Sequence, residues 1–142
     1  MDLVRIALIA SLAALACSSP ELPAADEFGD RRYSVALEAP SALSVGQAGS
    51  LDLAVRPKAG RHLSTEFPTR LELRTDGGIT APGRLEKSEA KRLDEKAIDY
   101  AAPLHAEAPG KATIHGTLQV GVCTGDLCER VELHFEREVQ VR

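Results

Sequence analysis

The chain has 142 residues, with 17 Lys and Arg against 21 Asp and Glu, so its formal net charge at pH 7 is −4. An acidic chain of this kind has no basic patch suited to nucleic acid and no polybasic run suited to anionic lipid. Aromatic side chains are scarce (three Phe, two Tyr and no Trp), which argues against a stacking platform for bases or sugars. The core must therefore consist mainly of Val, Leu, Ile and Ala.

The N-terminal residues have the features of a signal peptide. Arg5 precedes an uncharged, apolar stretch of residues 6–16, which is too short to cross a bilayer because a spanning helix needs about 20 apolar residues. Ala14 and Ala16 place small side chains just before Cys17. This pattern resembles the lipobox of bacterial lipoproteins, in which a peptidase cuts before the cysteine and the cysteine thiol is acylated. The alternatives are an ordinary signal peptide with a chance cysteine and an uncleaved anchor.

Residues after Cys17 predict where the protein lies. An aspartate at the next position would suggest retention at an inner membrane, so Ser18 favours an outer-membrane lipoprotein that faces the periplasm. Residues 18–32 have little apolar periodicity and contain two prolines, which is typical of a flexible tether. The sequence thus predicts a signal peptide (1–16), a lipidated tether (17–32) and a folded domain (33–142).

Alternation of apolar and polar residues dominates the predicted domain. A period of two with a polar opposite face indicates antiparallel strands that are half buried against a core. The charged segment 84–96 breaks the pattern; we expect a short edge strand and loop there, with a helical turn as the alternative. The predicted strands are, in chain order, residues 33–39, 51–55, 71–74, 98–104, 112–122 and 129–141.

Turn signals separate these strands. Clusters rich in Gly, Pro and Asp occur at 45–49, 57–60, 76–78 and 108–111, and such residues favour tight turns. Roughly six or seven short strands within about 110 residues are typical of an immunoglobulin-like sandwich. We therefore expect an all-β fold, an immunoglobulin-like antiparallel β-sandwich.

The three cysteines divide into one and two. If Cys17 carries lipid, Cys123 and Cys128 remain as an even pair in an oxidising compartment. They lie at the corner between two strands predicted to form a hairpin, where facing Cα atoms are about 4.5–5.5 Å apart. That spacing allows a disulfide, so we predict a Cys123–Cys128 bond.

The role of this bond stays open at the level of sequence. Closing a six-residue loop stabilises a fold by only about 2 kcal/mol, against about 4–5 kcal/mol for a loop of a hundred residues. This leaves room for a redox function at an exposed hairpin tip, although a structural staple is the favoured interpretation. No helix start follows Cys123 to lower a thiol pKa. A redox role would therefore be passive exchange by Cys123 and Cys128.

Three segments together resemble the N-terminal periplasmic domain of the thiol:disulfide interchange protein DsbD and the related disulfide bond corrector domains. The resemblance covers about residues 45–141. It is carried by residues 60–63 (Gly-Arg-His-Leu) with Phe67-Pro68, by residues 99–104 (Asp-Tyr-Ala-Ala-Pro-Leu) with Pro109-Gly110, and by residues 120–128 (Val-Gly-Val-Cys-Thr-Gly-Asp-Leu-Cys).

The resemblance implies an immunoglobulin-like sandwich whose cysteine pair receives electrons from a membrane-embedded domain and passes them to periplasmic partners. Cys123 and Cys128 would be that pair. The residues after the second cysteine, 129–131 (Glu-Arg-Val), lack the proline usual in the family. The 142 residues include no membrane bundle or thioredoxin-like domain, so we expect a separate membrane protein to supply the electrons.

The four histidines give little reason to expect a metal. His62 lies at a predicted turn, where a histidine is more often structural or solvated than functional. His105, His115 and His134 lie on polar strand faces, and the last two are expected to be neighbours across the hairpin. Two histidines without a thiol or carboxylate at matched spacing make a weak zinc site, so we predict neither a metal nor a cofactor.

Two functions remain in competition. The first is a non-enzymatic envelope lipoprotein, held at the membrane by lipid on Cys17, whose sandwich binds a protein partner or scaffolds a complex. The second is a thiol–disulfide exchange module that uses Cys123 and Cys128. Metal or small-ligand binding comes third, and the identity of the protein partner is open.

Overall fold

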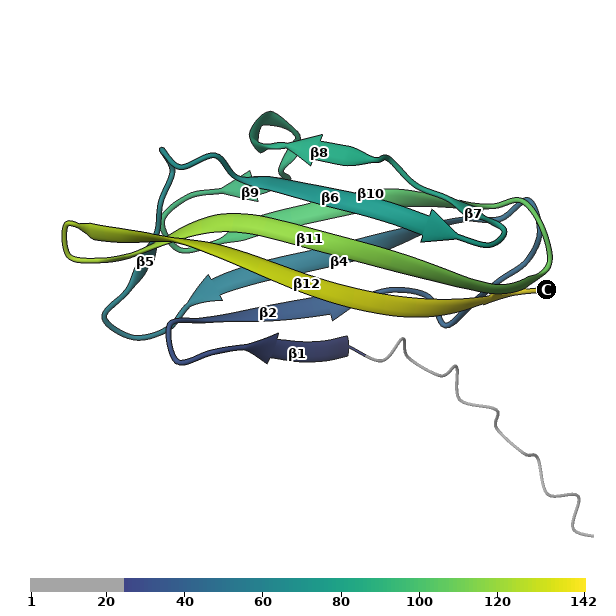
Figure 1. Cartoon of the computed structure of the whole chain (residues 1–142), viewed down its shortest axis with the longest axis horizontal. Coiled ribbons are helices and arrows are strands. Elements are labelled where there is room, and N and C mark those ends of the chain that lie inside the picture. The colour runs from purple at the N-terminus through teal and green to yellow at the C-terminus, as the bar shows by residue number, and fades with distance from the viewer. Residues whose placement is uncertain (1–24) are drawn as a thin grey trace, which may run out of the picture.

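The computed structural model describes residues 25–142, which form two β-sheets packed face to face (Figure 1). The predicted signal peptide and Cys17 lie outside the described residues. Within residues 25–142 the only helical element is a single 3₁₀ turn. No helix in this part of the chain is long and apolar enough to cross a membrane.

The first sheet consists of six strands that pair in antiparallel fashion. Strand β10 is its centre, because it pairs with β4 on one edge and with both β7 and β9 on the other. In spatial order the strands are β1 (Ala25–Gly29), β2 (Tyr33–Glu38), β4 (Ala48–Pro57), β10 (Ile98–Ala106) and β7 (Ile79–Thr80), with β9 (Arg92–Leu93) beside β10.

The second sheet also has six strands and is built around the long hairpin of β11 and β12. All its pairs are antiparallel except β3 with β12, which is parallel. In spatial order the strands are β3 (Ala42–Leu43), β12 (Leu127–Val141), β11 (Gly110–Thr124), β6 (Arg70–Asp76) and β8 (Arg84–Glu86), with β5 (His62–Leu63) beside β11.

The predicted alternation is confirmed along the long strands, and each of the six predicted strands is present with small differences at its ends. The alternate residues of these strands face one another between the two sheets and are almost fully buried; they include Val35, Leu37, Leu51, Leu53, Val55, Leu71, Ile98, Leu104, Ile114 and Leu118. Burying a side chain of this size stabilises the fold by about 1.5–3 kcal/mol. The fold is therefore an all-β, immunoglobulin-like sandwich with an aliphatic core.

Tyr100 is the one large aromatic side chain of the described chain that is buried to 1% exposure. Its hydroxyl donates a hydrogen bond to the carbonyl oxygen of Glu86 at 3.2 Å, which satisfies the polar end of the ring. Burial, assisted by the charges of Glu86 and Glu89, raises the pKa of Tyr100 to about 12.

Strand β1 corrects the predicted tether, because residues 25–29 of the proposed 17–32 segment belong to the sandwich. β1 pairs with β2 along its whole length, from Ala25 opposite Glu38 to Gly29 opposite Ser34. Phe28 packs against Phe135, with the ring centroids 6.3 Å apart. A five-residue edge strand with one large apolar residue has no detectable periodicity, so the sequence pattern did not predict it.

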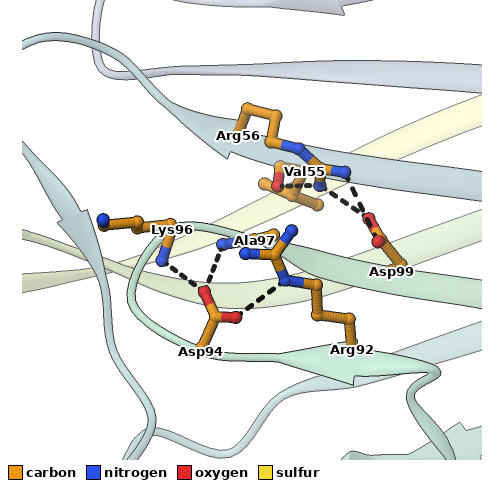
Figure 2. A network of polar contacts seen from close by, with 7 residues as sticks. All are labelled: Val55, Arg56, Arg92, Asp94, Lys96, Ala97 and Asp99. Atoms are coloured by element: carbon orange, nitrogen blue, oxygen red, sulfur yellow. Dashed lines mark hydrogen bonds and ion pairs between the residues drawn. The ribbon is translucent and has the colours of Figure 1, made fainter.

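The charged segment 84–96 contains β8, the 3₁₀ turn η1 (Lys87–Glu89) and β9, so the expected edge strand and loop are present. Asp94 closes the turn into β10 by accepting hydrogen bonds from Arg92 Nε at 2.7 Å and from the backbone N–H groups of Lys96 and Ala97 (Figure 2). These bonds, the one from the Arg92 side chain foremost, lower the pKa of Asp94. Nearby, Arg56 pairs with Asp99 at 2.6 Å.

Candidate functional site at the hairpin tip

The predicted disulfide lies near the end of the β11–β12 hairpin. The two strands pair over fifteen consecutive positions, and Cys123 stands opposite Cys128 in this register. Gly125 and Asp126 make the turn, with Gly125 in the left-handed region at φ 58°, as a primed two-residue hairpin turn with Gly first requires. In Figure 1 the tip extends beyond the neighbouring strands.

The two cysteines form the predicted bond and differ in exposure. Cys123 and Cys128 are disulfide-bonded, with their Cα atoms 3.9 Å apart, closer than the spacing expected for an unlinked pair. Cys123 is only 1% exposed, whereas Cys128 is partly exposed. Of the two cysteines, Cys128 is therefore the residue that solvent and an incoming thiol reach more readily.

His62 lies beside the disulfide, and the sequence did not predict this position for the histidine. Strand β5 pairs with β11 so that His62 is opposite Cys123. A ring nitrogen of His62 and the Sγ atoms of Cys123 and Cys128 all lie within 4.8 Å of one another. The family-like stretch at residues 60–63 was the one signal that pointed to this residue, but a two-residue strand leaves no alternation from which to infer its neighbour.

A loop covers the outer face of the sheet next to the disulfide. The backbone N–H of Ser64 donates to the carbonyl oxygen of Gly121 at 2.8 Å, and Ser64 Oγ accepts from the backbone N–H of Phe67 at 3.1 Å. The Phe67 ring lies so close over Gly121 that a Cβ there would be 2.7 Å from it. Gly121 and Cys123 share this face, so the cover helps to explain the burial of Cys123.

The turn itself is open to solvent. Leu127, which immediately precedes Cys128, is 71% exposed, the highest value among the large hydrophobic side chains of residues 25–142. Because side chains alternate along a strand, Leu127 points to the opposite face of the hairpin from Cys128.

An ion pair fixes the tip to the neighbouring sheet. Arg32, between β1 and β2, bonds Asp30 Oδ2 at 2.7 Å and Glu129 Oε2 at 2.9 Å. Glu129 directly follows Cys128, so this contact links the β1–β2 turn to the start of β12. The hydrogen bond from the Arg32 side chain is the main reason that the pKa of Asp30 is lowered.

His115 and His134, expected to be neighbours across the hairpin, are diagonal neighbours and not a directly opposed pair. The hairpin register places His115 opposite Glu136 and His134 opposite Thr117, two positions away from a direct pair. His115 lies between Asp76, at 2.8 Å, and Glu136, at 3.1 Å. The sequence placed the two histidines at the same distance from the tip within one position, and the two-residue turn makes the offset two positions.

The fold defines a class, the immunoglobulin-like β-sandwich, and comparisons agree with that class alone. No family model and no curated protein matches the chain. The cohesin module of a family 33 glycoside hydrolase from Clostridium perfringens is 13% identical, with a TM-score of 0.52 over 78% of this chain and 96% of that one. The GAE domain of GGA2p from Saccharomyces cerevisiae is 6% identical, with a TM-score of 0.52 over 80% and 97%.

Proposed function

We propose that this chain is a lipid-anchored envelope protein whose sandwich exchanges electrons with a protein partner through Cys123 and Cys128. The observation that carries the proposal is the asymmetry of the site: Cys128 is partly exposed, Cys123 is buried, and His62 lies beside both. The alternative is the binding or scaffold domain with a structural disulfide that the sequence favoured.

The disulfide is expected to contribute little to the stability of the fold. The bond closes a six-residue loop, for which the chain-entropy estimate is about 2 kcal/mol. The hairpin already holds the same residues together, because β11 and β12 pair at fifteen positions on the near side of the turn. The disulfide therefore removes less conformational entropy than the loop-closure estimate assumes, and a structural bond at this place adds little to the stability of the fold.

The arrangement suits a directional exchange. A thiolate of a partner dithiol attacks Sγ of Cys128, the S–S bond breaks, and Cys123 leaves as a thiolate beside His62. A protonated imidazole stabilises such a thiolate by its charge. The partner's second thiolate then attacks the mixed disulfide and releases Cys128. The partner is left as a disulfide, and the two cysteines gain two electrons and two protons.

The proposed anchor gives the exchange its setting. Lipid on Cys17 would hold the sandwich at the membrane surface by a short tether ending at β1, within reach of membrane-bound donors of electrons. Mass spectrometry of the purified protein tests this part: acylation of Cys17 at a new N-terminus supports it, and an unmodified or uncleaved N-terminus contradicts it. A Cys17→Ser variant should leave the membrane fraction.

The reduction potential of the Cys123–Cys128 pair tests the exchange. Equilibration against glutathione should give a value near about −200 mV, whereas a value below about −300 mV would identify a structural bond and support the scaffold alternative.

Single-cysteine variants test the direction of attack. Cys123→Ser leaves the partly exposed Cys128, which should react with a small aromatic disulfide at least about tenfold faster than the buried Cys123 of Cys128→Ser, because exchange depends on access. Equal rates would contradict the proposed order. His62→Ala should slow reduction of the intact pair, and His105→Ala, which removes an exposed histidine elsewhere on β10, is the matched control.

A further inference from the structure

His62, Cys123 and Cys128 are the one group of three histidine, cysteine or acidic side chains in residues 25–142 whose ligand atoms all lie within 4.8 Å of one another. The donors are two sulfurs and one imidazole nitrogen. In the oxidised protein the sulfurs are bonded to each other and cannot act as thiolate ligands. Reduction would create two thiolates beside a histidine.

We propose that the reduced Cys123–Cys128 pair and His62 together bind one Zn²⁺ ion, and that oxidation of the pair releases it. This inference requires only that the disulfide can be reduced, so it does not rest on exchange with a protein partner. It gives the tip two exclusive states, a disulfide without metal and a dithiolate with metal.

The distances suit tetrahedral zinc. With Zn–S bonds of about 2.3 Å and a Zn–N bond of about 2.0 Å, the two sulfurs lie roughly 3.8 Å apart and each lies roughly 3.5 Å from the nitrogen. The three ligand atoms already lie within 4.8 Å of one another. Rotation of the cysteine side chains after the S–S bond breaks is enough to separate the sulfurs, without movement of the strands.

The backbone that carries these ligands is held by many contacts. Cys123 and Cys128 belong to a fifteen-position ladder. His62 is fixed by its pairing with β11 and by its neighbour Leu63, which is fully buried and donates from its backbone N–H to the carbonyl oxygen of Glu95 at 2.9 Å. A prearranged backbone lowers the ordering cost of binding.

The chemistry of the donors selects the ion. Thiolate and imidazole ligands suit Zn²⁺ and disfavour Mg²⁺ and Ca²⁺, which prefer oxygen. Three protein ligands leave the fourth position of a tetrahedral ion open. Cys128 is partly exposed and the turn beyond it is open to solvent, so water or a side chain of a partner can take that position.

The steps balance. A trialkylphosphine reduces the disulfide with water as the oxygen donor, giving two thiols and a phosphine oxide. Zn²⁺ then displaces one proton from each thiol and binds the neutral imidazole, so binding releases two protons at a pH where the thiols are protonated. Two-electron oxidation by a disulfide such as oxidised glutathione restores the Cys123–Cys128 bond and frees the ion.

The test is Zn²⁺ binding by the full chain in detergent, reduced with a phosphine and freed of reductant without oxygen. Competition with a chromophoric chelator should show one Zn²⁺ per reduced chain, with half-saturation near 1 µM free ion, weaker than in four-ligand structural sites. The oxidised chain should bind at least about 100-fold more weakly. Equal binding by both forms would assign the ion to other groups and overturn the proposal.

A matched pair of variants tests His62. His62→Ala should weaken binding at least about tenfold and remove nitrogen coordination from the spectrum of the Co²⁺ form, which reports tetrahedral thiolate ligation. His105→Ala should change neither. If His62→Ala binds as tightly as the parent, the three-ligand site is wrong. Circular dichroism of each variant establishes that it is folded.

Linkage gives a second measurement that needs no substitution. Because Zn²⁺ would bind only the reduced pair, a free concentration 100 times the dissociation constant should raise the reduction potential by about 60 mV. An unchanged potential would overturn the zinc site. A low potential that still rises with Zn²⁺ would contradict the exchange function and leave the zinc site standing, so the two proposals fail separately.

Discussion

The two halves of the β11–β12 hairpin present opposite kinds of outer surface. In the half away from the turn, the outer face carries polar residues such as His115 and Thr117, and each of these is hydrogen-bonded to a polar group of a neighbouring strand. Near the tip the same face of β11 carries Gly121 and Cys123, which are buried. Residues 62–69 cover only this second half.

The comparison shows why histidines on similar strands have different chemical prospects. His115 is already engaged between two carboxylates, and His134 bonds Thr117 and Glu132. His62 instead faces the two sulfurs. A cluster of two sulfurs and an imidazole thus forms where a second segment covers the strand face, and an ordinary solvated face remains where none does.

The largest effect should come from filling the space under Phe67. In Gly121→Ala the new Cβ would be 2.7 Å from the Phe67 ring, so the covering loop must move. We expect a loss of about 1–3 kcal/mol in unfolding free energy and faster reduction of the disulfide by a phosphine. Denaturant melts and reduction kinetics check both.

The control for this substitution lies in the other half of the same strand. In Gly116→Ala the new Cβ would be 2.0 Å from the Phe135 ring, so stability should fall by a similar amount. The reduction rate should stay that of the parent, because Gly116 is far along β11 from Cys123. If both variants are reduced equally fast, the cover over the tip does not control access.

Reduction of the disulfide should have the next largest effect. We expect the unfolding free energy to fall by no more than about 2 kcal/mol, because the paired strands already close the hairpin. Denaturant melts of the oxidised and reduced parent protein measure the difference. A loss well above 2 kcal/mol would mean that the part of the hairpin near the tip depends on the disulfide for its stability. That result would support a structural role for the bond.

His115→Gln should change stability by less than about 1 kcal/mol, because its contacts with Asp76 and Glu136 involve exposed carboxylates. Its disulfide should be reduced at the parent rate. Denaturant melts and reduction kinetics again provide the readout. A change in reduction rate would show that the two halves of the hairpin are coupled and do not behave independently.

The smallest expected effect is the loss of the stability contributed by Asp30 at low pH. The pKa of Asp30 is lowered from 3.8, mainly by the hydrogen bond from Arg32, so its contribution is present above pH 3.8 and is lost as the pH falls through the lowered value. The side chain is 36% exposed, so we expect at most about 1 kcal/mol. Asp30→Asn should be less stable than the parent at pH 6, with the difference vanishing in strong acid.

The sequence predicted the long strands, because apolar and polar residues alternate over many positions in them. Strands such as residues 112–122 and 129–141 keep their parity long enough to define a buried face, and their junction predicted the disulfide. The two-residue strand β5 has no parity to detect, and its partner is distant in the chain. The position of His62 beside the cysteines was therefore beyond prediction, because it depends on tertiary packing of the loop over Gly121.

Strand β1 would determine how the domain responds to tension if Cys17 carries the proposed lipid. β1 begins at Ala25 and lies at the edge of its sheet, where it pairs with β2 alone. Tension from Cys17 would therefore break the β1–β2 pairs one after another from Ala25 onward. Releasing five residues would lengthen the tether by about 17 Å while β2 and the core remain paired. Under the proposed anchor, the first strand would serve as a reserve of chain length that extends the distance over which the hairpin tip can meet a partner.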